Sequence, residues 1–88
     1  MNDLGVLIVG AGKIAGRHAA AWQFLTSGRM AVTDAVEARA KHFAESRGID
    51  WEPDPEAALR RPGYEIIDVC SPPPSIHNPN PPHVISVE

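Results

Sequence analysis

The stretch LGVLIVGAGKIA, residues 4–15, decides the fold. Its first six residues form an apolar run with β-branched side chains, which is typical of a strand that is covered on both faces. Gly10 and Gly12 then interrupt this pattern, and helical spacing begins at Ile14. The stretch therefore predicts a buried strand, a tight glycine turn and a helix in direct succession.

The glycines belong to the pattern G-x-G-x-x-A, which runs from Gly10 to Ala15. In this pattern the first glycine permits the tight turn, the second lets the backbone approach a pyrophosphate, and the small last residue lets helix and strand pack closely. The first helical turn, with Lys13 and Ile14, offers free N–H groups and a partial positive charge to phosphates. The pattern predicts a dinucleotide site, and a purely structural glycine turn is the alternative.

Two other kinds of glycine loop fit the sequence less well. Gly5 and Gly10 have the separation found in a P-loop, but Ala11 and Gly12 follow where lysine and serine or threonine are required. A methyltransferase also binds an adenosine ligand beside a glycine loop, but nothing later in the chain supports that class. The dinucleotide site remains the preferred interpretation.

The rest of the chain alternates between strand and helix patterns. Ile14, His18, Ala21, Trp22 and Leu25 fall on one side of the first helix, and Gly28 suits the position just past its end. Further strands are predicted at residues 30–33, 49–51, 64–70 and 83–88, and further helices begin near residues 36 and 54 and stop at residues 48 and 62–63. This alternation predicts the α/β class, as a Rossmann-type doubly wound parallel sheet that is incomplete at its C-terminal end.

Asp34 follows the strand predicted at residues 30–33 and lies 34 − 10 = 24 residues after Gly10. An acidic residue about 20 residues beyond the first glycine accepts hydrogen bonds from the adenosine ribose in dinucleotide-binding domains. Its carboxylate repels the 2′-phosphate of NADP, so we expect NAD rather than NADP. Alternatively, Asp34 caps the helix that begins near Val36, and the two roles are compatible because a cap uses one oxygen.

Composition and charge exclude several partners. The formal net charge of −3 gives no general attraction to nucleic acid or to an anionic membrane, and the apolar run at residues 4–11 is too short to span a bilayer. Cys70 is the only cysteine, so no internal disulfide is possible, and a cytoplasmic location is expected. We expect no reactive pair of Cys70 with His77, and no metal shared by His77 and His83.

Three segments carry a resemblance to a known family: IVGAGKIAGRHAAA (8–21), DAVEARAKHFAESRGI (34–49) and IIDVCSPPPSIH (66–77). With them the chain resembles the N-terminal domain of the glucose–fructose oxidoreductase, inositol dehydrogenase and MocA (Gfo/Idh/MocA) family. The resemblance implies an NAD(P)-dependent oxidoreductase that moves a hydride between the nicotinamide and a sugar or polyol-like substrate. It also implies that Ser71, Pro72 and His77 lie near the ribose and nicotinamide. The same resemblance implies that Arg39 lies near the adenine. The alternative is that Arg39 is a solvated residue on the surface of its helix.

The sequence departs from the family pattern after His77. Family members continue with a crossover helix, a strand ending in Glu-Lys-Pro whose lysine is catalytic, and a substrate domain. Here residues 71–82 contain too much proline for a helix, and Glu88 is reached without that lysine. We therefore expect residues 1–88 to be one dinucleotide-binding domain without the crossover helix or the substrate domain, as a truncated or internally deleted form with no catalytic residue of its own.

This expectation extends to activity and partners. Alone, the chain should bind cofactor weakly and transfer no hydride, and a small-molecule substrate should bind only if a second domain is supplied. Without the crossover helix, apolar surface around Ile66, Ile67 and Val69 should be exposed, and the fourth strand should be an edge prone to self-association. The alternative function is a non-catalytic nucleotide-binding module that acts only through a protein partner.

Overall fold

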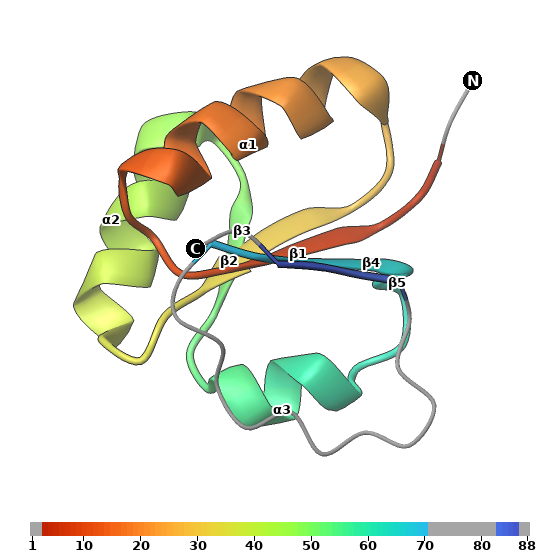
Figure 1. Ribbon diagram of the computed structural model, residues 1–88. Coiled ribbons are helices and arrows are strands. Elements are labelled where there is room, and N and C mark those ends of the chain that lie inside the picture. The colour runs from red at the N-terminus through yellow and green to blue at the C-terminus, as the bar shows by residue number, and fades with distance from the viewer. Residues whose placement is uncertain (1–2, 71–82, 87–88) are drawn as a thin grey trace.

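The computed structural model describes residues 3–70 and 83–86. Strands and helices alternate along the chain up to residue 69, and the next described element is again a strand (Figure 1). The elements are β1 (Val6–Val9), α1 (Lys13–Leu25), β2 (Met30–Thr33), α2 (Glu37–Arg47), β3 (Asp50–Glu52), α3 (Pro55–Arg60), β4 (Ile66–Val69) and β5 (His83–Ser86). Within this described part of the chain, no helix is long and apolar enough to cross a membrane.

The five strands form one parallel sheet in the order β3-β2-β1-β4-β5. Helices α1 and α2 cover one face of this sheet and α3 covers the other (Figure 1). The chain therefore starts in the middle of the sheet, builds outward to β3, and continues on the other side of β1 with β4 and β5. This confirms the doubly wound, Rossmann-type arrangement, in which ligands bind beyond the carboxyl ends of the strands near the point where the order reverses.

The central strand β1 is buried on both faces, as its continuous apolar run predicts. Its four side chains are between 0% and 4% exposed. Val6 and Ile8 pack in the cluster on the side of α1 and α2, whereas Leu7 and Val9 pack in the cluster on the side of α3. Burying each side chain of this size stabilises the fold by about 1.5–3 kcal/mol. The strand that leads into the glycine loop is therefore firmly fixed.

Helix α1 buries the predicted face only in part. Its buried residues are Ala15 and Ala19, while Ile14 and Leu25 are 38% and 56% exposed. Small side chains face the sheet because the helix packs directly over β1, and Trp22 continues the same face as a partly buried residue. The prediction is confirmed for His18 and Trp22, which reach Asp68 of the sheet, and wrong for Ile14 and Leu25, because small alanines permit the close packing.

The glycine expected to end α1 has another task. The helix ends at Thr26 in extended conformation, and a Cβ on Gly28 would lie 2.3 Å from the carbonyl oxygen of Asp3. Gly28 is therefore needed where two backbone segments approach each other. Two other predicted helix boundaries are confirmed. Gly48 ends α2 with a φ of 68°, and the Asp54 side chain caps α3 by accepting a hydrogen bond from the Glu56 N–H.

The fourth strand is neither exposed nor an edge, in contrast to the expectation. Ile66, Ile67 and Val69 are 8%, 1% and 1% exposed. Strand β5 pairs with β4 along its whole length, so the edges of the sheet are β3 and β5. Tyr64 and Ala58 of the α3 side also pack in the cluster that contains Ile67 and Val69. Self-association through an outer strand stays a prediction, and it no longer involves β4.

Candidate dinucleotide site

The glycine loop joins the carboxyl end of β1 to α1. Gly10 has a φ of 104°, which L side chains rarely adopt, so this turn requires glycine. Its N–H donates to the carbonyl oxygen of Thr33 at 2.8 Å, which fixes the turn against β2. Ala15 is fully buried in the same cluster as Ile8, where the helix meets the strand. Gly10 and Ala15 thus perform the structural tasks that the pattern assigns to their positions.

Gly12 has no comparable task within the protein. Its φ of −93° and ψ of −164° are extended backbone that any residue can adopt. A Cβ added to it would meet no atom of residues 3–70 or 83–86 within 4 Å. The packing of the chain therefore does not require glycine at this position, whereas a group bound directly above the loop would require it.

The amino end of α1 is open toward this loop. No side chain caps the helix at Gly12, and its first turn contains no acidic residue. Lys13 and Ile14 are both exposed there. The unpaired N–H groups and the helix dipole create a partial positive charge at this end, and Lys13 adds a full charge close by. The loop and helix together can therefore accept an anion.

Asp34 lies directly beside the glycine loop. Its carboxylate is almost completely buried, and Oδ2 accepts a hydrogen bond from the Ala11 N–H at 2.8 Å. Oδ1 accepts from the Val36 N–H at 2.8 Å, and Arg39 Nη1 lies 3.8 Å from Oδ2. Helix α2 itself has Val36 as its N-cap residue and no side-chain cap. The capping alternative is therefore wrong in detail, since Asp34 closes a turn before the helix and holds the glycine loop.

A basic hollow of about 480 Å³ lies next to the loop, between the amino end of α1 and α2. Arg39, Arg47 and Lys13 contribute positive charges, and the described residues that line it include no acidic side chain. The lining residues are Ala11, Gly12, Lys13, Arg39, His42, Phe43, Ser46 and Arg47. This charge distribution favours phosphate groups on the helix side of the loop. The Arg39 side chain is 61% exposed, so its guanidinium can turn from Asp34 toward the hollow.

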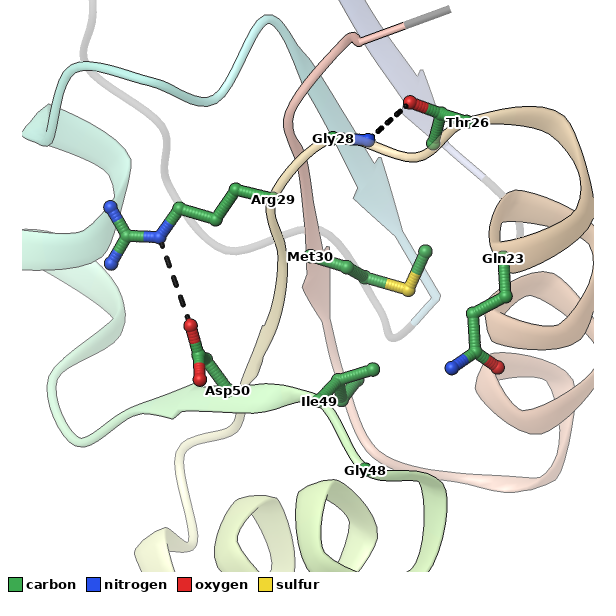
Figure 2. A pocket seen from close by; sticks show the side chains of 8 residues that line it. All are labelled: Gln23, Thr26, Gly28, Arg29, Met30, Gly48, Ile49 and Asp50. Carbon is green, nitrogen blue, oxygen red and sulfur yellow. Dashed lines mark hydrogen bonds and ion pairs between the residues drawn. The ribbon is translucent and has the colours of Figure 1, made fainter.

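A second cavity, of about 390 Å³, lies at the opposite end of the sheet. Figure 2 shows that Met30, Ile49 and Gln23 point into this space, while Arg29 extends away from it toward Asp50. Met30 and Asp50 begin β2 and β3, so the cavity lies at the amino ends of these strands. Ligands of parallel α/β sheets bind at the carboxyl ends. The glycine-loop end is therefore the candidate ligand site, and this cavity is not.

One cluster of polar side chains was not expected from the sequence. Asp68 of β4 is fully buried, and its Oδ2 lies 2.6 Å from His18 Nδ1 and 2.7 Å from Trp22 Nε1. Cys70 Sγ lies 3.5 Å from Oδ1 of the same carboxylate. Burial, together with the adjacent Asp68, raises the pKa of the Cys70 thiol to about 12. The signal in the sequence was an acidic residue inside the apolar run IIDVC, which demands buried partners.

The predicted residues thus fall into two groups. Gly10, Gly12, Lys13, Ile14 and Asp34 gather at the carboxyl ends of β1 and β2. Ser71, Pro72 and His77 lie outside the described residues. In the sequence these three residues come after β4. The last residue of β4, Val69, is paired with Val9 of β1, so β4 ends next to the start of the glycine loop.

The fold, with a glycine loop between the first strand and the first helix, defines an α/β domain of the Rossmann class. The chain belongs to the Gfo/Idh/MocA oxidoreductase family, whose model is described as an oxidoreductase family with an NAD-binding Rossmann fold and matches residues 4–86. It is thus an NAD-binding Rossmann domain by family. No curated protein matches the chain.

Solved structures support the same assignment. The chain is 26% identical to GenD2 from gentamicin A biosynthesis, which was solved in complex with NAD. The match has a TM-score of 0.70 and covers 82% of this chain and 21% of that one. It is 25% identical to a myo-inositol dehydrogenase from Corynebacterium glutamicum ATCC 13032, with a TM-score of 0.68, over 80% of this chain and 21% of that one.

A third structure shows the likeness of the fold alone. The chain is 22% identical to a putative NADPH-dependent oxidoreductase from Desulfitobacterium hafniense DCB-2, with a TM-score of 0.71, over 82% of this chain and 21% of that one. In all three comparisons the chain therefore spans about a fifth of the structure that it matches.

Proposed function

We propose that this chain is the NAD-binding part of an oxidoreductase that transfers a hydride between the nicotinamide and a sugar or polyol-like substrate. In this proposal the pyrophosphate lies over Gly10 and Gly12 and accepts hydrogen bonds from the first-turn N–H groups at Lys13 and Ile14. Asp34 accepts hydrogen bonds from the adenosine ribose. Ser71, Pro72 and His77, which follow β4, line the ribose and nicotinamide.

The observation that carries the proposal is the open space above Gly12. Gly12 has an extended backbone, and no atom of the described part of the chain lies within 4 Å of an added Cβ, so these residues give no structural reason for the missing side chain. Close approach of a pyrophosphate supplies that reason. The uncapped end of α1 and the charge of Lys13 lie at the same point, so shape and electrostatics agree.

We propose NAD rather than NADP because of Asp34. Each carboxylate oxygen can accept two hydrogen bonds, so the ribose hydroxyls can donate to it while Ala11 and Val36 keep their bonds. A 2′-phosphate would instead place like charges together, and two unit charges about 4 Å apart repel by up to about 4 kcal/mol near a protein surface. Arg39 offsets part of this repulsion, because its exposed guanidinium can turn from Asp34 to a phosphate.

Titration calorimetry with NAD and NADP tests this choice. We expect NAD to bind at least about tenfold more tightly, equivalent to about 1.4 kcal/mol. Arg39→Ala should weaken the binding of NADP and so increase the preference for NAD. The control Lys41→Ala, an exposed change on the same helix outside the hollow, should change the affinity for neither cofactor. Tighter binding of NADP than of NAD by the unchanged protein would contradict the assignment.

We propose hydride transfer for proteins of the length of the matched structures, and not for these 88 residues by themselves. Oxidation of an alcohol needs a group that takes the hydroxyl proton and a surface that holds the substrate against the nicotinamide. We assign neither to a residue of this chain, which spans 21% of the structures that it resembles. We expect no NADH formation by the isolated chain with a panel of polyols and sugars. Turnover that follows the protein through purification would contradict this part of the proposal.

A further inference from the structure

A compact group of three side chains of metal-ligating types lies between α1 and β4, with the Cys70 N–H bonded to the carbonyl oxygen of Val9 at 2.8 Å. Asp68 and Cys70 are two residues apart, so their side chains point to the same face of the sheet, toward His18 on α1. The His18 nitrogen, an Asp68 oxygen and the Cys70 sulfur all lie within 4.8 Å of one another. Two packed elements therefore bring a nitrogen, an oxygen and a sulfur donor together.

We propose that His18, Asp68 and Cys70 form a binding site for a zinc-like divalent cation. The ligand atoms would be His18 Nδ1, Asp68 Oδ1 and Cys70 Sγ, and a water would take the fourth tetrahedral position. Imidazole, carboxylate and thiolate are the three protein ligand types that Zn²⁺ prefers. None of these three ligands belongs to the glycine loop or to the residues proposed to bind the dinucleotide.

Binding requires the side chain of His18 to move, because its hydrogen bond to Asp68 Oδ2 is shorter than the separation of two zinc ligands, whereas Cys70 Sγ and Asp68 Oδ1 already have a suitable separation. Nδ1 of His18 lies 2.6 Å from Asp68 Oδ2, and Cys70 Sγ lies 3.5 Å from Oδ1. Ligands of a tetrahedral zinc with bonds of about 2.0–2.3 Å lie about 3.3–3.8 Å apart. The His18 side chain is 27% exposed and Cys70 is half-buried, so an ion and its water can enter from the solvent side.

The charges also balance. Asp68 is fully buried, and a buried carboxylate is costly unless it is paired. When the ion binds, Cys70 releases its thiol proton to solvent, and neutral His18 carries its remaining proton on Nε2. A carboxylate and a thiolate then neutralise the two positive charges of the ion. The hydrogen-bonded cluster of the metal-free protein is thereby replaced by a neutral buried centre.

Trp22 would orient the carboxylate from outside the ion. Its Nε1 donates to Asp68 Oδ2 at 2.7 Å, and this bond can persist while Oδ1 binds the metal. Such outer hydrogen bonds fix the direction of a ligand, and their removal typically lowers metal affinity about 10- to 100-fold. This bond gives a variant that tests the site without removing a ligand.

Cobalt titration of the metal-free chain tests the proposal, since Co²⁺ replaces Zn²⁺ and reports thiolate ligation by a charge-transfer absorption. We expect one equivalent of Co²⁺ with this absorption, and its displacement by Zn²⁺. Cys70→Ser should abolish the absorption and lower the affinity by more than about 100-fold, beyond the effect of an outer bond, and Trp22→Phe should lower it about 10- to 100-fold. His42→Gln, at an exposed histidine of α2, should leave both unchanged.

Thermal unfolding without metal identifies variants that remain folded. Because Cys70→Ser changes a single atom, it is the variant most certain to keep the fold. Absence of the thiolate absorption in the unchanged protein would overturn the proposal. Cobalt binding of equal affinity in Cys70→Ser would overturn it too, since histidines elsewhere would then hold the ion. In either case His18, Asp68 and Cys70 form a hydrogen-bonded cluster only.

Discussion

Replacing Asp34 by alanine tests whether its carboxylate holds the glycine loop in place. The change removes the acceptor of the Ala11 and Val36 N–H groups, both bonded at 2.8 Å. A hydrogen bond to a charged group contributes about 1.5–3 kcal/mol, and water can partly replace the bond to exposed Val36. We therefore expect Asp34→Ala to lower the free energy of unfolding by about 2–4 kcal/mol in the absence of cofactor.

Thermal unfolding followed by circular dichroism measures this effect. A loss of about 2–4 kcal/mol corresponds to a decrease of roughly 10–25 °C for a domain of this size. The matched control is Asp54→Ala, which removes one exposed capping bond to Glu56 at 3.0 Å and should cost about 1 kcal/mol. If Asp34→Ala unfolds at the same temperature as Asp54→Ala or above it, the carboxylate does not hold the loop and the reasoning is wrong.

Three further predictions concern other parts of the chain. Gly28→Ala should lower the free energy of unfolding by about 1–3 kcal/mol in chemical denaturation, because its Cβ would lie 2.3 Å from the Asp3 carbonyl oxygen; unchanged stability would contradict the close approach. Cys70 should react with iodoacetamide at least about 100-fold more slowly than a free thiol near about pH 8, because its raised pKa of about 12 keeps it protonated. The rate of alkylation should rise only as the pH approaches the pKa of the thiol, about 12. Reactivity equal to that of a free thiol in the folded, metal-free protein would refute the burial argument. Asp68→Asn should cost about 2–3 kcal/mol in denaturant titration, because the neutral amide oxygen accepts weaker hydrogen bonds from His18 and Trp22 than the carboxylate does; a neutral effect would contradict a stabilising cluster.

The sequence was sufficient for the order of elements because each one carries its own local signal. The four residues of β1 are apolar because both faces are covered, and Gly10 marks a turn that only glycine adopts easily. Gly48 and the Asp54 cap mark helix ends through local backbone geometry. These signals depend on neighbouring residues in the chain, so they can be read without the folded structure.

The remaining features depend on contacts between distant residues. The Asp34 carboxylate meets a backbone N–H that lies 23 positions away, and the His18 pair with Asp68 spans 50 positions. The prediction for the buried face of α1 missed Ala15 and Ala19, because close packing on β1 selects small side chains there. Only the arrangement of the helices on the sheet shows which of these residues come together.

The central claim is that a dinucleotide binds over Gly12, and calorimetric titration of Gly12→Val with NAD tests it most directly. The φ of −93° and the open space around the Cβ position allow a side chain, so the variant should fold with an unchanged melting temperature. Loss of one or two hydrogen bonds from helix N–H groups to the pyrophosphate should cost about 3 kcal/mol or more, which is at least roughly a 100-fold loss of affinity. Ala20→Val, an exposed change on the same helix, should bind NAD as the unchanged protein does. NAD affinity that is equal in folded Gly12→Val and in the unchanged protein would contradict the claim and leave the glycine loop with a structural role alone.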